Sequence, residues 1–247
     1  MAKSDFTDFG KINIPKNKKT SLVNNLFGEV SDKYDLMNDL MSLGIHRLWK
    51  EQFLDWMAPR ETHHLLDLAG GTGDIGLNFL KRGGGITTVA DLNFKMLSTG
   101  QKKITNNKFN QRLNWINCNG EKLPFNDEEF DLVSISFGLR NVTEKDIALG
   151  EIYRVLKKGG RFMCLEFSKV NIASLNVLYK FWSNNVIPFL GEKVSGNRKN
   201  YEYLIESIKR FPDQSQLSSV IRSAEFKLVK HRNLSGGIAA IHSGWKI

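Results

Sequence analysis

The chain has 247 residues, of which 41% are hydrophobic, 25% charged and 11% aromatic, a composition that excludes a disordered or fibrous chain. The net charge of +9 favours nucleic acid or anionic lipid as a partner, but it also suits a solvated surface without a partner. No apolar run reaches the ~18 residues of a membrane-spanning helix. With two cysteines and no secretory signal at the N-terminus, the sequence predicts a reduced, cytoplasmic protein.

The N-terminal quarter has a different pattern from the rest of the chain. Residues 1–20 are lysine-rich, polar and aperiodic, so we expect a basic, flexible arm. Residues 21–60 carry a helical signal, in which Leu22, Leu26 and Val30 recur at four-residue spacing. This segment is predicted to form a helical cap.

Short apolar runs alternate with amphipathic stretches over residues 61–247. This alternation is typical of an α/β fold with a doubly wound, mostly parallel sheet of the Rossmann type. Two late apolar runs around a Gly-Gly turn predict a hairpin that adds an antiparallel C-terminal edge strand. No linker marks a second domain, so 21–247 is predicted to be a single domain. The predicted strands are 64–69, 86–91, 113–117, 130–135, 161–167, 226–232 and 238–245, and the predicted helices are 75–81, 95–106, 146–157 and 175–187.

A glycine-rich segment, Leu65 to Gly76 (LLDLAGGTGDIG), ends the first predicted strand and opens a helix. Gly70, Gly71 and Gly73, with Thr72 among them, permit a tight turn and let backbone amides approach a ligand. The segment fits the pattern G-x-G-x-x-G, which is weak evidence for a nucleotide when it stands alone.

An acidic residue supplies the missing part of this fingerprint. Asp91 ends the second predicted strand, about 20 residues after the glycines, where a carboxylate can accept both hydroxyls of a ribose. NAD and S-adenosylmethionine (SAM) both contain that ribose. Asp67 distinguishes them, because a dinucleotide fingerprint normally has only apolar residues inside the strand, ahead of the pyrophosphate. An acid here resembles motif I of the class I SAM-dependent methyltransferases, and in that resemblance Asn119 and Gly120 lie beside the adenine and Ser136 lines the methyl-donor cavity.

Further segments narrow the resemblance to one family. They resemble the ubiquinone/menaquinone biosynthesis C-methyltransferases, the UbiE family, over roughly residues 22–247. Two departures from the family pattern are Lys158, where proline is usual, and Gly120, where alanine is common. The matching segments are Tyr34–Trp49 (with Tyr34, Asp35, Met37, Asn38, Ser42, His46, Arg47 and Trp49), Phe137–Asn141 (FGLRN), Arg154–Gly160 continuing to Ser168, and Tyr203–Gln214.

The resemblance implies methyl transfer from SAM to a ring carbon of a polyprenylated quinol, either a methoxy-polyprenyl-benzoquinol or demethylmenaquinol. An ionised quinol oxygen makes its ortho carbon nucleophilic, so the protein must align donor and acceptor and favour the phenolate. Arg140 is the candidate for stabilising the phenolate, although a salt-bridged structural arginine would look the same. His46 is the candidate general base, or else a hydrogen-bonded core residue of a lid; Tyr34 and Asp35 are equally compatible with substrate contact and with packing.

The same resemblance implies a lipid-soluble substrate. Together with the basic charge it predicts peripheral contact with the inner face of the membrane, and a homodimer or a quinone-biosynthesis complex is compatible with it. The histidines and cysteines lack the spacing of a zinc site, so no metal is predicted.

Three other functions compete with this prediction. A nucleic-acid methyltransferase of the base-amino type needs an Asn/Asp-Pro-Pro-aromatic loop after the fourth strand, but no two of the five prolines are adjacent. Cytosine-carbon methylation uses a Pro-Cys nucleophile, whereas Cys118 and Cys164 follow Asn117 and Met163. A non-catalytic SAM-binding assembly component and an NAD dehydrogenase are the remaining alternatives, and titration with SAM and NAD separates the second from a methyltransferase.

Overall fold

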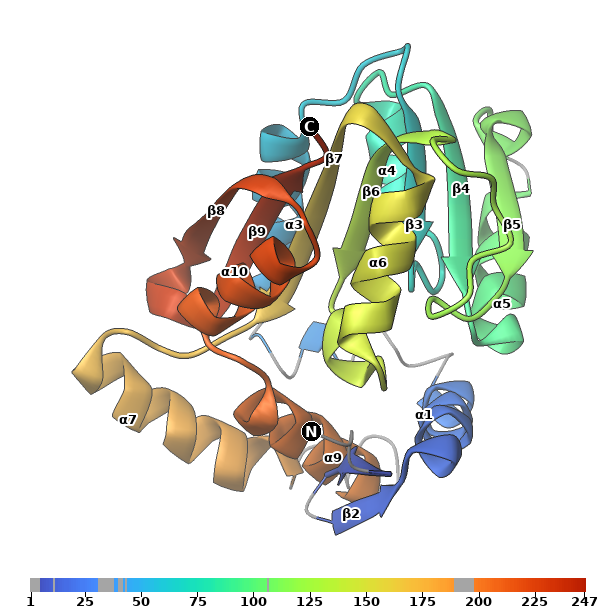
Figure 1. Cartoon of the computed structure of the whole chain (residues 1–247). Helices are drawn as coiled ribbons and strands as arrows, with labels where there is room; N and C mark the ends of the chain where they lie inside the picture. Colours follow the sequence, from blue (N-terminus) through green and yellow to red (C-terminus); the bar gives the residue numbers. More distant parts are fainter. Residues whose placement is uncertain are drawn as a thin grey trace.

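A computed structural model of the chain describes residues 5–10, 12–30, 38–39, 42, 44–105, 107–188 and 198–247. Its centre is a seven-stranded sheet with helices on both faces (Figure 1). The spatial order is β5-β4-β3-β6-β7-β9-β8. The strands are β3 (His64–Leu68), β4 (Ile86–Asp91), β5 (Leu113–Asn117), β6 (Phe130–Ser136), β7 (Leu156–Phe167), β8 (Lys227–Leu234) and β9 (Ala239–Trp245).

The pairing of the strands confirms the predicted doubly wound, mostly parallel sheet. The five strands from β5 to β7 are parallel, whereas β9 runs antiparallel to both β7 and β8. The direction in which the chain adds strands reverses between β3 and β6. In such sheets ligands bind beyond the carboxyl ends of the strands at this switch point.

Two hydrophobic cores, one on each face, hold the helices to the sheet. Residues of α3, α4 and α5 belong to one core, and residues of α6 and α10 to the other. The helices are α1 (Lys16–Val30), α3 (His46–Met57), α4 (Asp74–Lys81), α5 (Phe94–Ile104), α6 (Lys145–Val155), α7 (Ala173–Phe181), α9 (Arg198–Arg210) and α10 (Gln214–Ser223), with the 3-10 turns η2 (Asn110–Arg112), η3 (Leu139–Asn141) and η5 (Ser235–Gly237) and the π-helix η4 (Trp182–Val186).

The start of the chain differs from the flexible arm that the sequence predicts over 1–20. An antiparallel hairpin of β1 (Phe6–Phe9) and β2 (Ile12–Pro15) leads directly into α1, which begins at Lys16. Phe9 packs on the Tyr203 ring of α9, with 4.5 Å between ring centroids. This contact joins residues almost two hundred positions apart, so a local pattern of polar residues cannot reveal it.

The remaining differences concern the end of one predicted helix and two helices that the prediction lacks. The helix predicted over 146–157 ends at Val155, and β7 begins at the next residue. Gly159 is therefore part of that strand, where its N–H donates to the carbonyl of Lys246 at 2.8 Å. The helices α9 and α10 are absent from the prediction, although α10 begins with a capping box in which Asp213 and Gln216 bond reciprocally. Tyr34, Asp35 and Met37 lie outside the described residues.

Candidate active site

The glycine turn after β3 needs its glycines for two separate reasons. Gly71 and Gly73 have φ angles of 56° and 76°, in the region that side chains with a Cβ rarely adopt. A Cβ on Gly73 would also lie 2.6 Å from the Trp115 ring, and one on Gly70 would lie 2.8 Å from Asp67. The turn therefore brings bare backbone to the start of α4, at the carboxyl edge of the sheet.

Asp67 stabilises this turn from within strand β3. Its carboxylate accepts hydrogen bonds from the Ser134 hydroxyl at 2.8 Å and the Gly76 N–H at 3.2 Å. Burial raises the pKa of Asp67 to about 7, although both hydrogen bonds act in the opposite direction. The side chain also borders a small cavity shared with Gly70, Thr72 and Ser136.

Asp91, at the end of β4, faces a larger pocket beside the same turn. Its two oxygens each accept one backbone N–H at 2.8 Å, from Gly71 and from Asn93. Burial raises the pKa of the Asp91 carboxyl, with these backbone bonds opposing the shift. The carboxylate keeps lone pairs that can accept the hydroxyls of a ribose.

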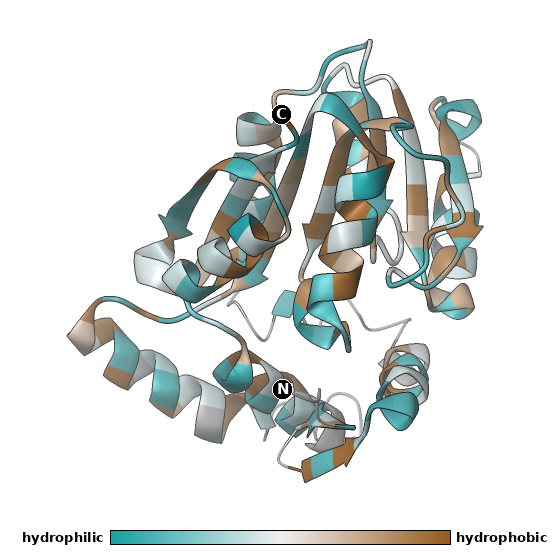
Figure 2. Cartoon of the chain, viewed as in Figure 1, coloured by the Kyte–Doolittle hydropathy of each residue, from teal (hydrophilic) through white to brown (hydrophobic). Residues whose placement is uncertain are grey.

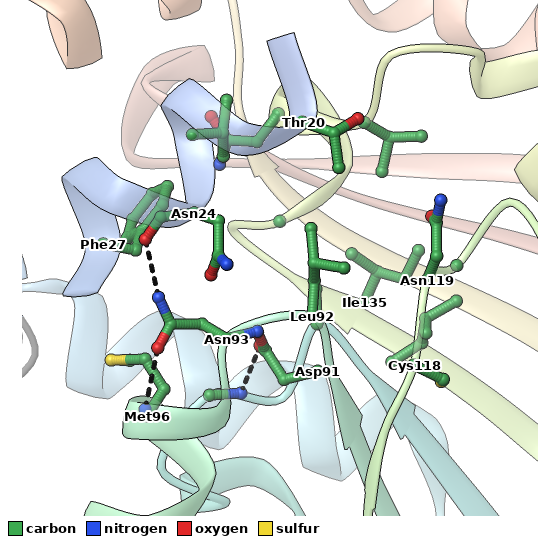
Figure 3. A pocket seen from close by; sticks show the side chains of 18 of the residues that line it. Thr20, Asn24, Phe27, Asp91, Leu92, Asn93, Met96, Cys118, Asn119 and Ile135 are labelled. Atoms are coloured by element: carbon green, nitrogen blue, oxygen red, sulfur yellow. Dashed lines mark hydrogen bonds between the residues drawn. The ribbon is translucent and has the colours of Figure 1, made fainter. Parts of the chain in front are cut away.

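Helix α1 covers this pocket, which we call the nucleoside pocket (Figure 3). Asn93 holds α1 in place, because its side-chain amide donates to the carbonyl of Asn24 at 2.7 Å. The side-chain oxygen of Asn93 accepts the N–H of Met96 and so caps α5. Thr20 approaches Thr143 on the far rim at 3.4 Å. This helix lies largely within the helical cap that the sequence predicts over 21–60, but it begins at Lys16, and the sequence analysis assigns none of its residues to a pocket. The residues of α1 that line the pocket are Thr20, Val23, Asn24 and Phe27.

The opposite wall of the nucleoside pocket holds the residues predicted to lie beside an adenine. Asn119 and Gly120 line it together with Leu68 and Ile135. Asn119 accepts the N–H of Glu121 at 3.0 Å, which fixes the loop. Burial raises the pKa of the half-buried Cys118 to about 11, so its thiol stays protonated at neutral pH.

The small cavity at the glycine turn combines charges of both signs. Lys50 of α3 lines it with Asp67 and Asp74, and its ammonium donates to Asp74 at 2.7 Å. Within the described ranges, the buried Ser136 hydroxyl has no hydrogen-bond partner. A cavity with acids, a lysine and a hydroxyl offers partners of both charges, as the ammonium and carboxylate of an amino acid require.

The two residues predicted to be catalytic lie at different places. His46 is buried on α3 with Nε2 2.9 Å from Asp39, and it borders another cavity together with Thr72, Gly73 and Lys50. Burial lowers the pKa of His46, and the nearby Lys50 lowers it further. The neutral, hydrogen-bonded imidazole matches the core residue that the sequence analysis allows as an alternative.

Arg140 is located in η3, beyond the end of β6. Its guanidinium donates to the Glu166 carboxylate at 2.6 Å and to the carbonyl of Phe137 at 2.5 Å. It also lies over the Phe167 ring, 5.7 Å from the centroid. The structure thus pairs Arg140 with an acid, which matches the alternative of a salt-bridged arginine in the sequence analysis.

Other features limit what the site can do. Among the described residues, no three His, Cys, Asp or Glu side chains are grouped to hold a metal ion. In the same ranges, every helix is too short or too polar to cross a lipid bilayer. What the structure does provide is a nucleoside pocket, a small adjoining cavity lined by charged and polar groups, and a buried ion pair at one edge of the sheet.

A doubly wound sheet with this turn and this acid defines a class I SAM-dependent methyltransferase, and solved structures share the fold. A SAM-dependent methyltransferase from Thermotoga maritima, described as a possible histamine N-methyltransferase, has a TM-score of 0.64 at 21% identity and covers 90% of this chain and 99% of its own. A putative SAM-dependent methyltransferase from Methanococcus maripaludis has a TM-score of 0.61 at 17% identity, over 89% of this chain and 93% of its own.

Sequence similarity identifies the family. The model of the ubiE/COQ5 methyltransferase family matches residues 14–246, so the chain belongs to this family. A Ubiquinone/menaquinone biosynthesis C-methyltransferase UbiE from Ruegeria sp. is 51% identical over 99% of both chains. The protein of the same name from Acidiphilium cryptum is 48% identical over 99% of this chain and 98% of its own. The cofactor of the family is SAM, as the sequence predicts.

Proposed function

We propose that this protein transfers a methyl group from SAM to a ring carbon of a polyprenylated quinol, either a methoxy-polyprenyl-benzoquinol or demethylmenaquinol. Similarity over nearly the whole chain to named C-methyltransferases of ubiquinone/menaquinone biosynthesis supports SAM-dependent C-methylation by an enzyme of this pathway. The observation that supports the proposal is that two cavities adjoin the glycine turn, one lined by Asp91 and one by Asp67, and we assign them to the two ends of SAM.

When bound, SAM supplies a methyl group on a positively charged sulfur. We assign the ribose to Asp91, the adenine side to Asn119 and Gly120, and the amino-acid end to the cavity that Asp67 and Ser136 border. The backbone of Gly70, Gly71, Thr72 and Gly73 forms the turn between these places. Helix α1 covers one side of the pocket and so shields the polar contacts within it from part of the solvent.

Methyl transfer to a short-chain quinol tests this proposal. The purified protein is mixed with SAM and either a demethylmenaquinol or a methoxy-benzoquinol kept reduced, and the products are identified by mass. We expect a ring-methylated product and S-adenosylhomocysteine in equal amounts. Binding of S-adenosylhomocysteine without turnover would instead indicate an assembly component, and methylation of nucleic acid would indicate the rival substrate class.

We also propose that the protein works at the inner face of the cytoplasmic membrane, where a quinol with a polyprenyl tail is dissolved. Val177 and Phe181 of α7 are 72% and 62% exposed, and Phe6 and Ile12 of the hairpin are exposed as well. Figure 2 shows the apolar residues along α7 and β2, below the carboxyl ends of the parallel strands. The net charge of +9 complements anionic lipid.

Sedimentation with vesicles tests the membrane contact. We expect binding to vesicles of phosphatidylglycerol and phosphatidylcholine at low salt, weaker binding at high salt, and a loss in the double variant Val177→Asp, Phe181→Asp. Ile86→Asp is the matched control, because Ile86 is exposed at the opposite, amino end of β4. Equal binding of both variants would exclude α7 as the contact. Size-exclusion chromatography with light scattering tests the proposed homodimer or larger complex.

A further inference from the structure

The ion pair of Arg140 and Glu166 is buried and incompletely satisfied. The two residues are 4% and 1% exposed and lie beyond β6 and near the end of β7, next to the edge where the SAM site is formed. Within the part of the chain that the structure describes, neither Nε of Arg140 nor Oε2 of Glu166 has a hydrogen-bond partner. Buried polar atoms almost always have partners, so these two atoms mark a place where an ordered water or a polar group of a ligand completes the hydrogen bonding.

Arg140 by itself cannot stabilise the phenolate, which is the role that the sequence predicts for it. Its charge is already balanced by the Glu166 carboxylate at 2.6 Å, so no net positive charge is left to stabilise a phenolate. A guanidinium also has no lone pair with which to accept a proton. The acceptor in this pair is the carboxylate, whose Oε1 is held by Arg140 while Oε2 has no partner among the described residues.

The groups around Glu166 come from several elements. Lys145 of α6, Tyr203 of α9 and Cys164 of β7 interact with it electrostatically, and Tyr179 of α7 faces Arg140. Burial raises the pKa values of both tyrosines and of Cys164, so these groups stay protonated at neutral pH. Burial lowers the pKa of Lys145 to about 8, and its ammonium donates to the carbonyl of Val142 at 3.0 Å.

We propose that Glu166 accepts the hydroxyl proton of the quinol and that Arg140 is the positioning residue that holds the carboxylate with Oε2 available. This assignment rests on the proposed quinol substrate. The O–H bond breaks and its proton goes to Oε2, while its electron pair moves into the ring. The ortho carbon then forms a bond to the methyl group, whose bond to sulfur breaks and leaves its electrons on sulfur. The ring carbon loses its proton to water, and Glu166 returns its own proton to the oxygen.

The acidity of Glu166 suits this transfer. Burial raises its pKa to about 7, although Arg140 and Lys145 pull it down. A quinol hydroxyl resembles that of tyrosine, with a pKa of about 10. An acceptor whose pKa is near 7 makes the proton transfer less unfavourable than an ordinary carboxylate would, and it is still partly ionised at neutral pH. An unperturbed carboxylate would be a weaker base by several powers of ten.

The first experiment compares Glu166→Gln and Glu166→Asp with the wild-type protein from pH 6 to 10 on a soluble quinol. We expect kcat of Glu166→Gln to fall by about 10²–10⁴-fold at pH 7, with an intermediate loss in Glu166→Asp. The wild-type rate should rise through pH 7, whereas the Gln variant should lack this rise and recover toward pH 10. A halogenated quinol of lower pKa should suffer a smaller loss. Glu166→Gln leaves the buried Arg140 charge unpaired, so its free energy of unfolding should fall, and unchanged affinity for S-adenosylhomocysteine shows that the variant is still folded.

A second measurement does not depend on turnover. With S-adenosylhomocysteine in the cofactor site, the ultraviolet spectrum of a bound halogenated quinol, chosen with a pKa close to that of Glu166, should show a larger phenolate fraction at pH 7 in the wild type than in Glu166→Gln. Wild-type kcat in a folded Gln variant would overturn the proposal. So would a loss that neither high pH nor the acidic quinol reduces, because that loss would be structural. Failure of the wild-type protein to methylate any quinol would overturn the proposed function instead.

Discussion

The cofactor half and the substrate half of the site are stabilised differently. In the first, Asp67 and Asp91 are held by backbone N–H groups and one hydroxyl, and each bond within the turn spans at most 20 residues. In the second, Arg140 and Glu166 hold each other across 26 residues, and Tyr203 reaches Asn141 across 62. In the cofactor half the carboxylates accept hydrogen bonds from neutral donors, one of which, the Ser134 hydroxyl, is 67 residues from Asp67 in the sequence. The substrate half instead buries a charge pair.

This difference has consequences for mutation. A carboxylate held by backbone amides leaves only N–H groups behind when it is removed, and water or a ligand can satisfy these. A carboxylate paired with a buried arginine leaves a full charge behind, which a protein interior stabilises poorly. We therefore expect substitutions in the substrate half to lower the free energy of unfolding, and substitutions in the cofactor half to weaken cofactor binding.

The largest effect is expected when the buried pair is broken. Arg140→Met should lower the free energy of unfolding by about 3–5 kcal/mol, because it leaves Glu166 without its countercharge. The double variant Arg140→Met, Glu166→Leu should lose much less, since no charge remains to be buried. Urea unfolding of the wild type, the two single variants Arg140→Met and Glu166→Leu, and the double variant measures this coupling. Additive losses in the double variant would show that the two residues do not act as a pair.

The cofactor half is tested by affinity. Asp91→Ala removes an acceptor of two ribose hydroxyls, and we expect binding of S-adenosylhomocysteine to weaken by on the order of 2–4 kcal/mol while the protein stays folded. Asp127→Ala is a matched control, because Asp127 is an exposed acid that pairs with Arg154 at 2.8 Å, away from both cavities. Calorimetric titration measures both. Unchanged affinity in a folded Asp91 variant would remove the ribose assignment.

The same difference explains which features the sequence predicts. The glycine turn and Asp91 form a contiguous strand, turn, helix and strand, and their spacing is itself the signal. The strands β3, β4 and β5 lie within one residue of their predicted positions. The pairing of Arg140 with Glu166 has no such signal, because it depends on β6 and β7 lying side by side. The sequence analysis therefore names the arginine and leaves its partner open.

The start of the helix over the nucleoside pocket was placed five residues too late, at residue 21 instead of Lys16, for a different reason. Thr20, Val23, Asn24 and Phe27 recur at three- and four-residue spacing, which is the periodicity of one helix face. The prediction places the boundary between arm and cap at residue 20 because lysines dominate the preceding segment. It also selects Leu22, which the structure leaves exposed. The signal was present, and a helical window starting at residue 16 would have found it.

The pH dependence of stability tests whether Asp67 keeps a proton in the native state. Asp67 has its pKa raised to about 7, from 3.8, by burial. Between these values the native state keeps a proton that the unfolded state has lost, so the free energy of unfolding falls with rising pH by up to about 1.4 kcal/mol per unit. Asp67→Asn removes this slope. Its amide can still accept the Gly76 N–H and donate to the Ser134 hydroxyl.

Urea unfolding at pH 5 and pH 6 checks this prediction. The wild type should lose more stability over that interval than Asp67→Asn. Asp131→Asn serves as the control, because hydrogen bonds from His64 and Lys157 outweigh burial and lower the pKa of Asp131. Its contribution is lost only as the pH falls through the acid range, below the interval measured. Identical slopes in the wild type and the Asp67 variant would mean that Asp67 is ionised in the native state.

The smallest effect is expected at two glycines of the cofactor half. A Cβ on Gly120 would meet the Leu68 side chain at 3.5–3.7 Å, which is ordinary van der Waals contact, whereas one on Gly73 would meet Trp115 at 2.6 Å at a φ of +76°. Gly120→Ala should therefore keep its affinity for S-adenosylhomocysteine and gain about 0.4–1 kcal/mol of stability, because alanine restricts the unfolded chain. Gly73→Ala should lose both affinity and stability. Thermal unfolding with and without S-adenosylhomocysteine separates the two variants. A loss of affinity in Gly120→Ala would mean that the ligand approaches this backbone more closely than a methyl group allows, which would itself place the adenine against Gly120.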